Sequence, residues 1–382
     1  MTDKQLLSSR ALALHRENRG KLGIVSKVPL ANRDDLSLAY TPGVAAVSEA
    51  LAADSALMYE LTPKGNMVAV ISDGSAVLGL GNIGPEGAYP VMEGKCLLMR
   101  QFAGLDAFPI VLKTQNTEEI ISIVENLSPG FGGINLEDIS APRCFEIEER
   151  LRASLDIPVF HDDQHGTAIV VLAGLINALK VVGKDKNVKI VLNGAGAAGI
   201  SISNLLLLAG YRNQIILDTL GAIYEGRLEN MNSAKDEIAK KTNPASLRGE
   251  LKEIMKDADV FIGISKGGLV TKEMVRGMAA EAVVFAMANP VPEIMPEDAL
   301  EAGAKIVASG RSDYPNQLNN VLVFPGMFRG ALDNRIKQFT DQMFLNAASA
   351  LAALVKNPTA EKIITSPFDE GVAATIAASI KL

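Results

Sequence analysis

Two short acidic segments and one glycine-rich segment are the parts of this chain whose residue types and spacing best suit chemistry. Residues 161–168 contain the neighbouring carboxylates Asp162 and Asp163, and a second acidic pair, Glu137 and Asp138, precedes them. Residues 194–199 (Gly-Ala-Gly-Ala-Ala-Gly) follow. Carboxylate oxygens suit a hard divalent cation, and a glycine turn of this form suits a dinucleotide. The combination predicts the metal-assisted oxidation of a small acid.

The segment around Asp162 also has an ordinary structural explanation. Asp and Thr before an apolar run are typical of a helix start, where they cap free backbone N–H groups and interact favourably with the helix dipole. Thr167 stands where such a cap is expected. Alone, the segment favours capping; the acidic neighbours shift the interpretation toward a metal.

The glycine segment predicts a nucleotide site, because an apolar run leads into it and an expected helix follows. Gly194 permits a tight turn, Gly196 lets the backbone approach a pyrophosphate, and Gly199 allows close packing of helix on strand. Ala195 and Ala197 complete the turn. The phosphates then lie at the N-terminus of the helix.

Asp218 ends the next expected strand, about 20 residues beyond the glycines, where a carboxylate accepts hydrogen bonds from the adenosine ribose. It predicts NAD in preference to NADP, since it repels a 2′-phosphate. Arg212 or Arg227 would accommodate that phosphate if the following loop folds back, and Asp218 as an ordinary surface residue is the alternative. Asn289, at the end of a later strand, is placed to face the nicotinamide or the substrate.

Composition narrows the class of protein. A chain of 382 residues with 48% hydrophobic residues predicts about two domains. The net charge of −7 argues against a nucleic-acid partner. Two scattered cysteines, Cys96 and Cys144, indicate a reducing cytoplasm. We expect neither a signal peptide nor a membrane span, and interpret residues 169–175 as a buried helix.

The alternation of short apolar runs with helical segments predicts an α/β fold. From residue 161 to 382 we expect a Rossmann-like, doubly wound parallel sheet followed by C-terminal helices; residues 1–160 form an N-terminal α/β catalytic domain. A helix over 167–182 joins the two. The expected strands are 68–72, 107–112, 130–136, 188–192, 214–218, 259–264, 282–287 and 305–309. The other expected helices are 87–101, 117–126, 199–209, 233–241, 247–257 and 271–280.

At this point the chain resembles the malic enzymes of the short bacterial kind, along nearly its whole length. The order and spacing of several motifs carry the resemblance. They are residues 39–44 (Ala-Tyr-Thr-Pro-Gly-Val), 78–84 (Leu-Gly-Leu-Gly-Asn-Ile-Gly), 93–95 (Glu-Gly-Lys), both acidic segments, the glycine turn, Asn289-Pro290, and Asn319-Asn320-Val321 ahead of 324–326 (Phe-Pro-Gly).

The resemblance implies oxidation of L-malate to pyruvate and CO₂ with a nicotinamide cofactor and Mg²⁺ or Mn²⁺. Lys95 then matches the general base, and burial with a nearby cation must lower its pKa. Tyr40 matches the general acid that protonates C3. A homodimer or larger homo-oligomer is also implied. The metal ligands implied are Glu137, Asp138 and Asp163, with Asp162 as a supporting carboxylate; the substrate contacts implied are Asn289, Asn319 and Asn320.

The chain departs from larger relatives in two places. Ala76 and Val77 stand where those proteins carry an arginine for the substrate carboxylate, and Lys266 stands where many have an uncharged residue. Malolactic chemistry, which yields lactate without net NADH, and a non-catalytic nucleotide-binding module are the alternative functions. The short chain argues against the first, and the joint presence of Tyr40, Lys95 and the acidic residues against the second.

Overall fold

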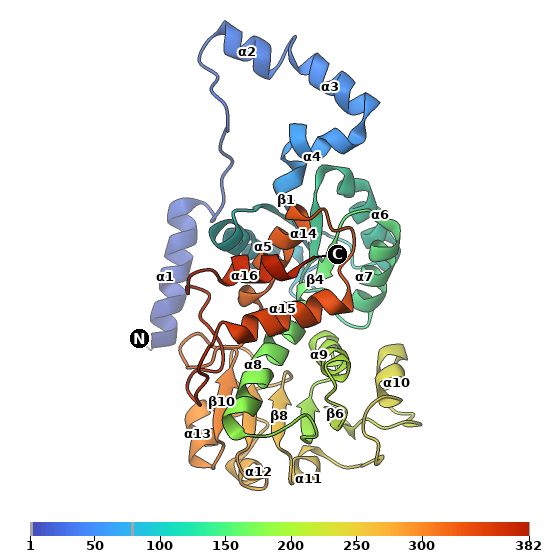
Figure 1. Cartoon of the computed structure of the whole chain (residues 1–382), viewed down its shortest axis with the longest axis vertical. Coiled ribbons are helices and arrows are strands. Elements are labelled where there is room, and N and C mark those ends of the chain that lie inside the picture. Colours follow the sequence, from blue (N-terminus) through green and yellow to red (C-terminus); the bar gives the residue numbers. More distant parts are fainter. Residues whose placement is uncertain (1–2, 78–79, 382) are drawn as a thin grey trace.

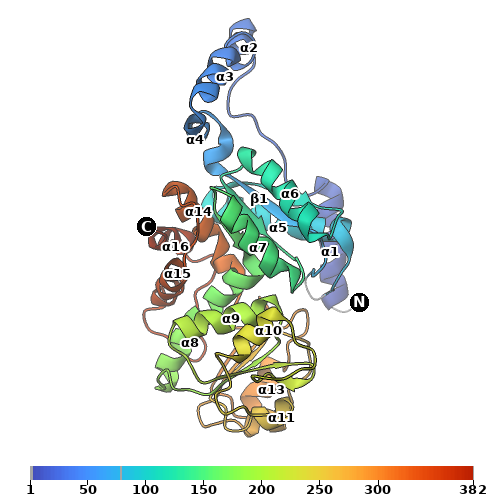
Figure 2. The ribbon, with the colours of Figure 1, turned by 90° about the vertical axis from the view of Figure 1, so that its right-hand side faces the viewer.

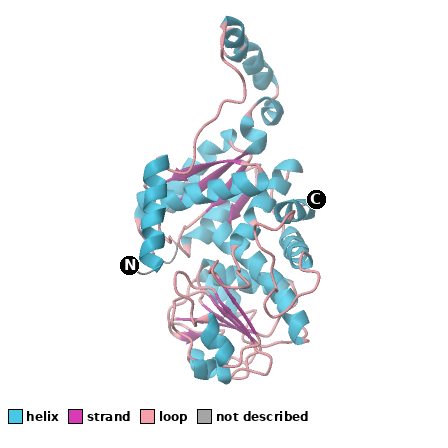
Figure 3. Cartoon of the chain, turned by 90° about the vertical axis from the view of Figure 1, so that its left-hand side faces the viewer, coloured by secondary structure: helices cyan, strands magenta, loops and turns pink. Residues whose placement is uncertain are grey.

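Two β-sheets organise the fold and lie one beyond the other along the long axis of the molecule (Figures 1 and 3). Their strands are parallel except for one edge strand of the second sheet. The description comes from a computed structural model and covers residues 3–77 and 80–381. Helices lie on both faces of each sheet, as the α/β class requires. A third part, residues 28–57 of the N-terminal segment, extends away from both (Figures 1 and 2).

The first sheet has the strand order β2-β1-β3-β4, with every pair parallel. Strand β1, one of the two inner strands, is apolar on both faces: Val68 and Val70 pack toward α5, whereas Ala69 and Ile71 pack toward α6 and α7. Such two-sided burial is the reason for a continuous apolar run in a parallel strand. The elements are η2 (Pro63–Asn66), β1 (Met67–Ser72), α5 (Gly84–Ala103), β2 (Asp106–Val111), α6 (Thr117–Leu127), η3 (Ser128–Gly130), β3 (Gly133–Leu136), α7 (Arg143–Ser154) and β4 (Val159–His161).

The second sheet has the order β10-β9-β8-β5-β6-β7, in which the first five strands are parallel and β7 is antiparallel. The chain reverses direction across the sheet beside β5, as in a doubly wound fold, so a ligand crevice is expected at the carboxyl end of β5. The elements are β5 (Ile190–Asn193), α9 (Ala197–Leu208), β6 (Gln214–Asp218), β7 (Gly221–Ala222), α10 (Ser233–Ala239), α11 (Leu251–Ile254), β8 (Val260–Gly263), α12 (Lys272–Arg276), β9 (Val283–Ala286), α13 (Pro296–Glu301) and β10 (Ile306–Ser309).

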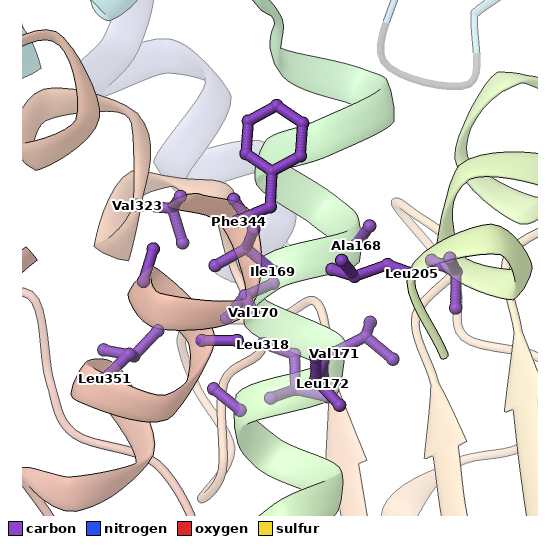
Figure 4. Packing of buried hydrophobic residues seen from close by; sticks show 14 of the residues in the cluster. Ala168, Ile169, Val170, Val171, Leu172, Leu205, Leu318, Val323, Phe344 and Leu351 are labelled. Atoms are coloured by element: carbon purple, nitrogen blue, oxygen red, sulfur yellow. The ribbon is translucent and has the colours of Figure 1, made fainter. Parts of the chain in front are cut away.

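Helix α8 (Thr167–Val182) begins and ends where the sequence predicts and links the two sheets. With the preceding π-helical turn η4 (Asp162–Gly166) it forms a helical stretch of 21 residues, in which an 18-residue window has a mean hydropathy of 1.7, so the stretch is long and apolar enough to cross a membrane. However, 67% of that window is buried inside the fold. Its side chains pack against α9 and the C-terminal helices (Figure 4), so α8 has the burial of a core helix.

The C-terminal helices return to the first sheet. Helix α14 packs against α5 and α16. Two glycines on α14 allow its close approach to α16. A Cβ at Gly326 would stand 2.7 Å from the Ala373 carbonyl oxygen, and one at Gly330 would stand 2.5 Å from that of Ala377. The elements are η5 (Asn320–Leu322), α14 (Phe324–Asp333), α15 (Asp341–Ala353) and α16 (Val372–Ser379).

Part of the N-terminal segment projects from the body of the molecule: residues 28–57 stand away from it, whereas residues 3–18 lie alongside it (Figures 1 and 2). Lys21 holds its base on α5, through its backbone N–H to Glu93 Oε1 (3.1 Å) and its Nζ to the Pro90 carbonyl (2.7 Å). Helices α2 and α3, described in full, contain no buried residue. The elements are α1 (Asp3–Asn18), α2 (Arg33–Ala39), α3 (Val44–Ala53), η1 (Ser55–Leu57) and α4 (Met58–Leu61). We call residues 28–57 the arm.

Two expected helices are wrong in extent. Over 247–257 only Leu251–Ile254 are helical, since Gly249 has a φ of +132° just ahead of them. Over 271–280 only Lys272–Arg276 are helical. Strands β4 and β7 have three and two residues and were not expected.

Candidate active site

Three carboxylates meet at the junction of the two sheets. One oxygen each from Glu137, Asp138 and Asp163 lies within 4.8 Å of the others. Glu137 and Asp138 follow β3, whereas Asp163 lies on η4 after the neighbouring strand β4. The backbone N–H of Asp138 donates to Asp163 Oδ2 (2.8 Å) and fixes one side of the group. The structure thus brings together the three residues proposed as metal ligands.

Lys95 lies buried beside this group. Its Nζ is 2.9 Å from Glu137 Oε1, contacts Asp162 Oδ2 more closely, and stands 4.6 Å from the centroid of the Phe324 ring. Burial lowers the pKa of Lys95, but Asp162, Glu137 and Asp163 outweigh it, so the pKa is raised in the metal-free chain. The pKa of Lys95 is therefore raised, not lowered as expected from the sequence, because the negative charges of the three carboxylates favour the protonated lysine.

Burial shifts the pKa values of the carboxyl groups in the direction opposite to its effect on the lysine. Burial raises the pKa of Glu137 and of Asp162 to about 7, although Lys95 opposes the shift in both. Burial also raises the pKa of Asp163. Within the described chain, Asp162 Oδ1 is buried without a hydrogen-bond partner. Oxygens of Glu137, Asp138 and Asp163 gathered within 4.8 Å of one another repel unless a cation joins them, and oxygen ligands suit a hard divalent ion, so these three residues fit a divalent metal.

Gly166 fixes the position of Asp162. A Cβ added at this glycine would lie 1.9 Å from Asp162 Oδ1 and 3.1 Å from the Asn320 Cβ. The π-helical turn therefore folds its last residue tightly against its first, as such turns often do at functional sites. Thr167 opens α8 without a side-chain cap, since the N-cap position is Gly166. Capping is not the role of this segment.

Glu148 supports the turn from α7. It is buried, accepts a hydrogen bond from the His161 backbone N–H (3.0 Å), and pairs with His165 Nε2 at 2.9 Å. These contacts hold η4 at both ends. Sequence reasoning missed Glu148; its position on the apolar face of the helix 143–154 was the available signal.

The glycine turn has the predicted geometry. Gly194 has a φ of +129°, and a Cβ there would meet the Ile264 carbonyl at 2.9 Å. A Cβ at Gly199 would stand 1.8 Å from the Gly194 carbonyl, so helix and turn touch. Gly196 is the N-cap of α9 and faces open space. The space beside Gly196 at a helix N-terminus is where a pyrophosphate would bind.

Asp218 lies at the carboxyl end of β6 but is already paired. It contacts Arg227 closely, Lys235 Nζ at 2.6 Å and Asn230 Nδ2 at 3.0 Å. Burial raises its pKa, yet these partners outweigh burial and the pKa is lowered. Arg227 thus folds back as considered above, whereas Arg212 lies elsewhere, on the wall of a cavity beyond α9. Sequence reasoning missed Lys235, which lies on α10.

The three asparagines differ in role. Asn319 caps η5, its side chain accepting a hydrogen bond from the Val321 N–H (2.9 Å). Asn320, the next residue, lies against Gly166 and so beside the carboxylates. Asn289 follows β9 at the carboxyl edge of the second sheet, exposed, with its Nδ2 near Gly310. Lys266, after β8, is exposed as well.

Tyr40 is the exception among the expected site residues. It ends α2 on the arm, is 66% exposed, and lies away from the carboxylates of its own chain (Figure 1). Within one chain, Tyr40 therefore does not join Lys95 and the carboxylates, and its role as the general acid stays a prediction. In the motif 78–84, Leu78 and Gly79 lie outside the described residues.

Comparisons with known proteins agree with this geometry. The malic enzyme N-terminal domain matches residues 19–152, and the malic enzyme NAD binding domain matches residues 164–381. A bifunctional malic/malolactic enzyme of Bacillus subtilis is 56% identical over 98% of this chain and 92% of its own. An NADP-dependent malic enzyme of Rhizobium meliloti is 51% identical over 95% of this chain and 48% of its own. The crystal structure of an NAD-dependent malic enzyme from Thermotoga maritima superimposes with a TM-score of 0.94, at 50% identity, over 97% of this chain and 98% of its own.

The dinucleotide fold, the match to the NAD binding domain and the NAD- and NADP-dependent relatives identify an NAD(P)-dependent oxidoreductase. The match of both domain models, which together cover most of the chain, makes the family plain. The chain belongs to the malic enzyme family.

Proposed function

We propose that the chain catalyses the metal-dependent oxidative decarboxylation of L-malate to pyruvate and CO₂, with NAD or NADP as oxidant. The observation that carries the proposal is the buried group of Lys95, Asp162 and the three carboxylates, set beside the glycine turn. Glu137, Asp138 and Asp163 would hold Mg²⁺ or Mn²⁺. When bound, the cation supplies polarisation of the C2 oxygen of malate and stabilisation of the enolate left by CO₂.

Lys95 is the base that takes the proton of the C2 hydroxyl. Burial alone lowers its pKa, and the opposing carboxylates lose that influence to the extent that a cation takes up their charge. Asp162 contacts Lys95 Nζ and has a pKa raised to about 7. Asp162 is therefore suited to receive the lysine proton. This role is more specific than the general support expected from the sequence.

Tyr40 is the acid that protonates C3, and we infer that it serves a second copy of the chain. The arm buries none of its helical residues and exposes Leu30 (66%) and Leu38 (78%) as well as Tyr40. Exposed apolar side chains grouped on one segment are typical of a surface that another protein covers. A homodimer in which arms are exchanged would cover them and complete each site.

The cofactor site favours NAD less strongly than the sequence suggests. Arg227 and Lys235 together carry more positive charge than Asp218 carries negative, so a 2′-phosphate meets a net attraction there. We expect Lys235→Ala to raise the KM for NADP by about tenfold, in line with the loss of one charge-assisted contact, with the KM for NAD changing less. An equal effect on both KM values would contradict the assignment.

The central experiment follows products. Purified chain with L-malate and Mn²⁺ should convert NAD or NADP to its reduced form and yield pyruvate; Lys95→Ala should abolish this while NAD still binds. Lactate without NADH accumulation would establish the malolactic alternative. Tight NAD binding without turnover of malate would establish the non-catalytic one.

Chain length does not separate malic from malolactic activity. The expectation that a short chain disfavours the malolactic reaction is wrong, since the bifunctional protein of Bacillus subtilis is matched over 92% of its length. Product analysis therefore decides. A reducing cytoplasm remains our proposal for location, supported by the two free, buried thiols of Cys96 and Cys144.

A further inference from the structure

A cavity of about 890 Å³ lies beside the turn η4, on the face of α9 that points away from the second sheet. Its walls come from α7, which covers the first sheet, from η4, α8, α9 and the end of α10, and from the C-terminal helix α15. Figure 2 shows α7, α9 and α10 together on this side of the molecule. No step of the proposed reaction uses the cavity.

The floor of the cavity is apolar. Ala168 and Leu205 face each other between α8 and α9, and Phe344 stands above them (Figure 4). The Phe344 ring stacks on His165, with centroids 4.6 Å apart and an angle of 24° between the planes. A flat, apolar body of ligand size would find a surface here.

The rim is positively charged. Arg212, Lys240 and Lys241 line it and are exposed, whereas Asp341 is the acidic residue among the lining side chains. Lys240 is paired with Glu237 at 2.5 Å, but Arg212 and Lys241 form no ion pair with any described residue. On a chain of net charge −7, such a local excess of positive charge selects an anion.

A buried hydrogen-bond donor also lines the cavity. Gln164 is 4% exposed, and its Nε2 has no hydrogen-bond partner in the part of the chain that the structure describes. An unpaired buried amide is costly, and an acceptor atom of a ligand would remove the cost. This donor is independent of the charged rim.

We propose that this cavity binds a small anion-headed ligand with a flat apolar body, its head at Arg212 and Lys241 and its body against Phe344 and Leu205. A ligand there contacts α7, which packs on the first sheet, and α9, which packs on the second. It also touches Gln164 and His165, which follow the metal-ligand candidate Asp163 on the same turn. Its binding is therefore coupled to the position of η4. The proposal is independent of the reaction, because binding alone tests it.

The test uses 8-anilinonaphthalene-1-sulfonate, a fluorescent aromatic sulfonate, titrated into the full chain with excess NAD to cover the nucleotide site. We expect saturation at one probe per chain. Asn204→Trp places an indole in the cavity from the half-buried side of α9 and should weaken binding at least about tenfold. The neutral analogue N-phenyl-1-naphthylamine should bind at least about tenfold more weakly than the sulfonate.

The double variant Arg212→Glu and Lys241→Glu should weaken sulfonate binding about tenfold. The double variant Lys252→Glu and Lys256→Glu, an equal charge change at exposed residues on and just after the distant α11, should leave it unchanged. Arg212 and Lys241 are exposed, so their double variant stays informative if Asn204→Trp fails to fold. The absence of saturable probe binding in excess NAD, equal binding of the neutral analogue, or unchanged affinity in the Arg212→Glu and Lys241→Glu variant would each overturn the proposal.

Discussion

At the scale of single residues, the active site depends on one missing side chain. Asp162 reaches Lys95 because the turn closes over Gly166, whose Cα leaves no room for a Cβ beside Asp162 Oδ1. The lysine, its proton acceptor and the metal-ligand candidates are thus positioned by backbone geometry. Gly166 carries no reactive group, yet it controls the position of residues that do.

We expect Gly166→Ala to lower kcat about 100-fold, because a displacement of Asp162 by an ångström or so misplaces Lys95. Steady-state kinetics with malate and Mn²⁺ measure it. Gly130→Ala is the matched control, since nothing lies within 4 Å of the added Cβ, and it should retain wild-type kcat. Equal kcat for the two variants would show that Gly166 does not position Asp162.

The pKa values of Glu137 and Asp162 make a second prediction. Both are raised in the folded chain, from ordinary values of 4.5 and 3.8 to about 7, chiefly by burial. The folded state then binds more protons than the unfolded state between about pH 4 and 7, so stability falls as pH rises through that window. Buried His161, whose pKa is lowered to about 4, acts in the opposite direction below its ordinary value of 6.5, but it is one group against two. In EDTA we therefore expect the melting temperature to fall from pH 5 to pH 8.

Mn²⁺ should restore much of that loss at pH 8, because it binds the folded state and offsets the carboxylate charge. Glu137→Gln combined with Asp162→Asn should flatten the pH dependence in EDTA. Differential scanning fluorimetry measures both effects. A wild-type melting temperature that rises between pH 5 and 8 in EDTA would contradict the assigned shifts.

At the scale of elements, the turn between β5 and α9 separates two roles of glycine. Gly199 packs against the Gly194 carbonyl, whereas Gly196 faces open space. We expect Gly199→Ala to lower both the melting temperature and NAD affinity. Gly196→Ala should lower NAD affinity about tenfold or more with little thermal effect, because its Cβ occupies the pyrophosphate space. Calorimetric titration with NAD and thermal melts distinguish them; equal thermal losses would contradict this division.

How much the sequence predicts follows the same physics. Periodicity and the glycine turn predict α8, β6 and the other parallel strands except the three-residue β4, because burial on both faces leaves a continuous apolar pattern. Two-residue β7 and the short α11 leave too little pattern to detect. The carboxylate group was predictable by residue type. The pairing of Asp218 with Lys235 depends on how the intervening loop folds, which no local pattern specifies.

At the scale of the whole molecule, the site that we propose is incomplete within one chain. The arm carries Tyr40 away from Lys95 on helices that bury nothing (Figure 1). An isolated chain would leave these apolar side chains in water, whereas a symmetric pair can exchange arms so that each covers the other. Dimer formation and completion of the site are then the same event.

Mixing two inactive variants tests this arrangement. Tyr40→Phe and Lys95→Ala each disable every site of their own homodimer. After co-refolding at equal amounts, random pairing makes half the dimers mixed, and each mixed dimer with exchanged arms has one intact site. We therefore expect about a quarter of wild-type activity to return. If each chain supplied its own Tyr40, both sites of a mixed dimer would carry a lesion, and activity would stay at the level of the separate variants. Wild-type chains taken through the same refolding control for recovery, and the mass in solution should be that of a dimer or larger assembly of the 40.5 kDa chain.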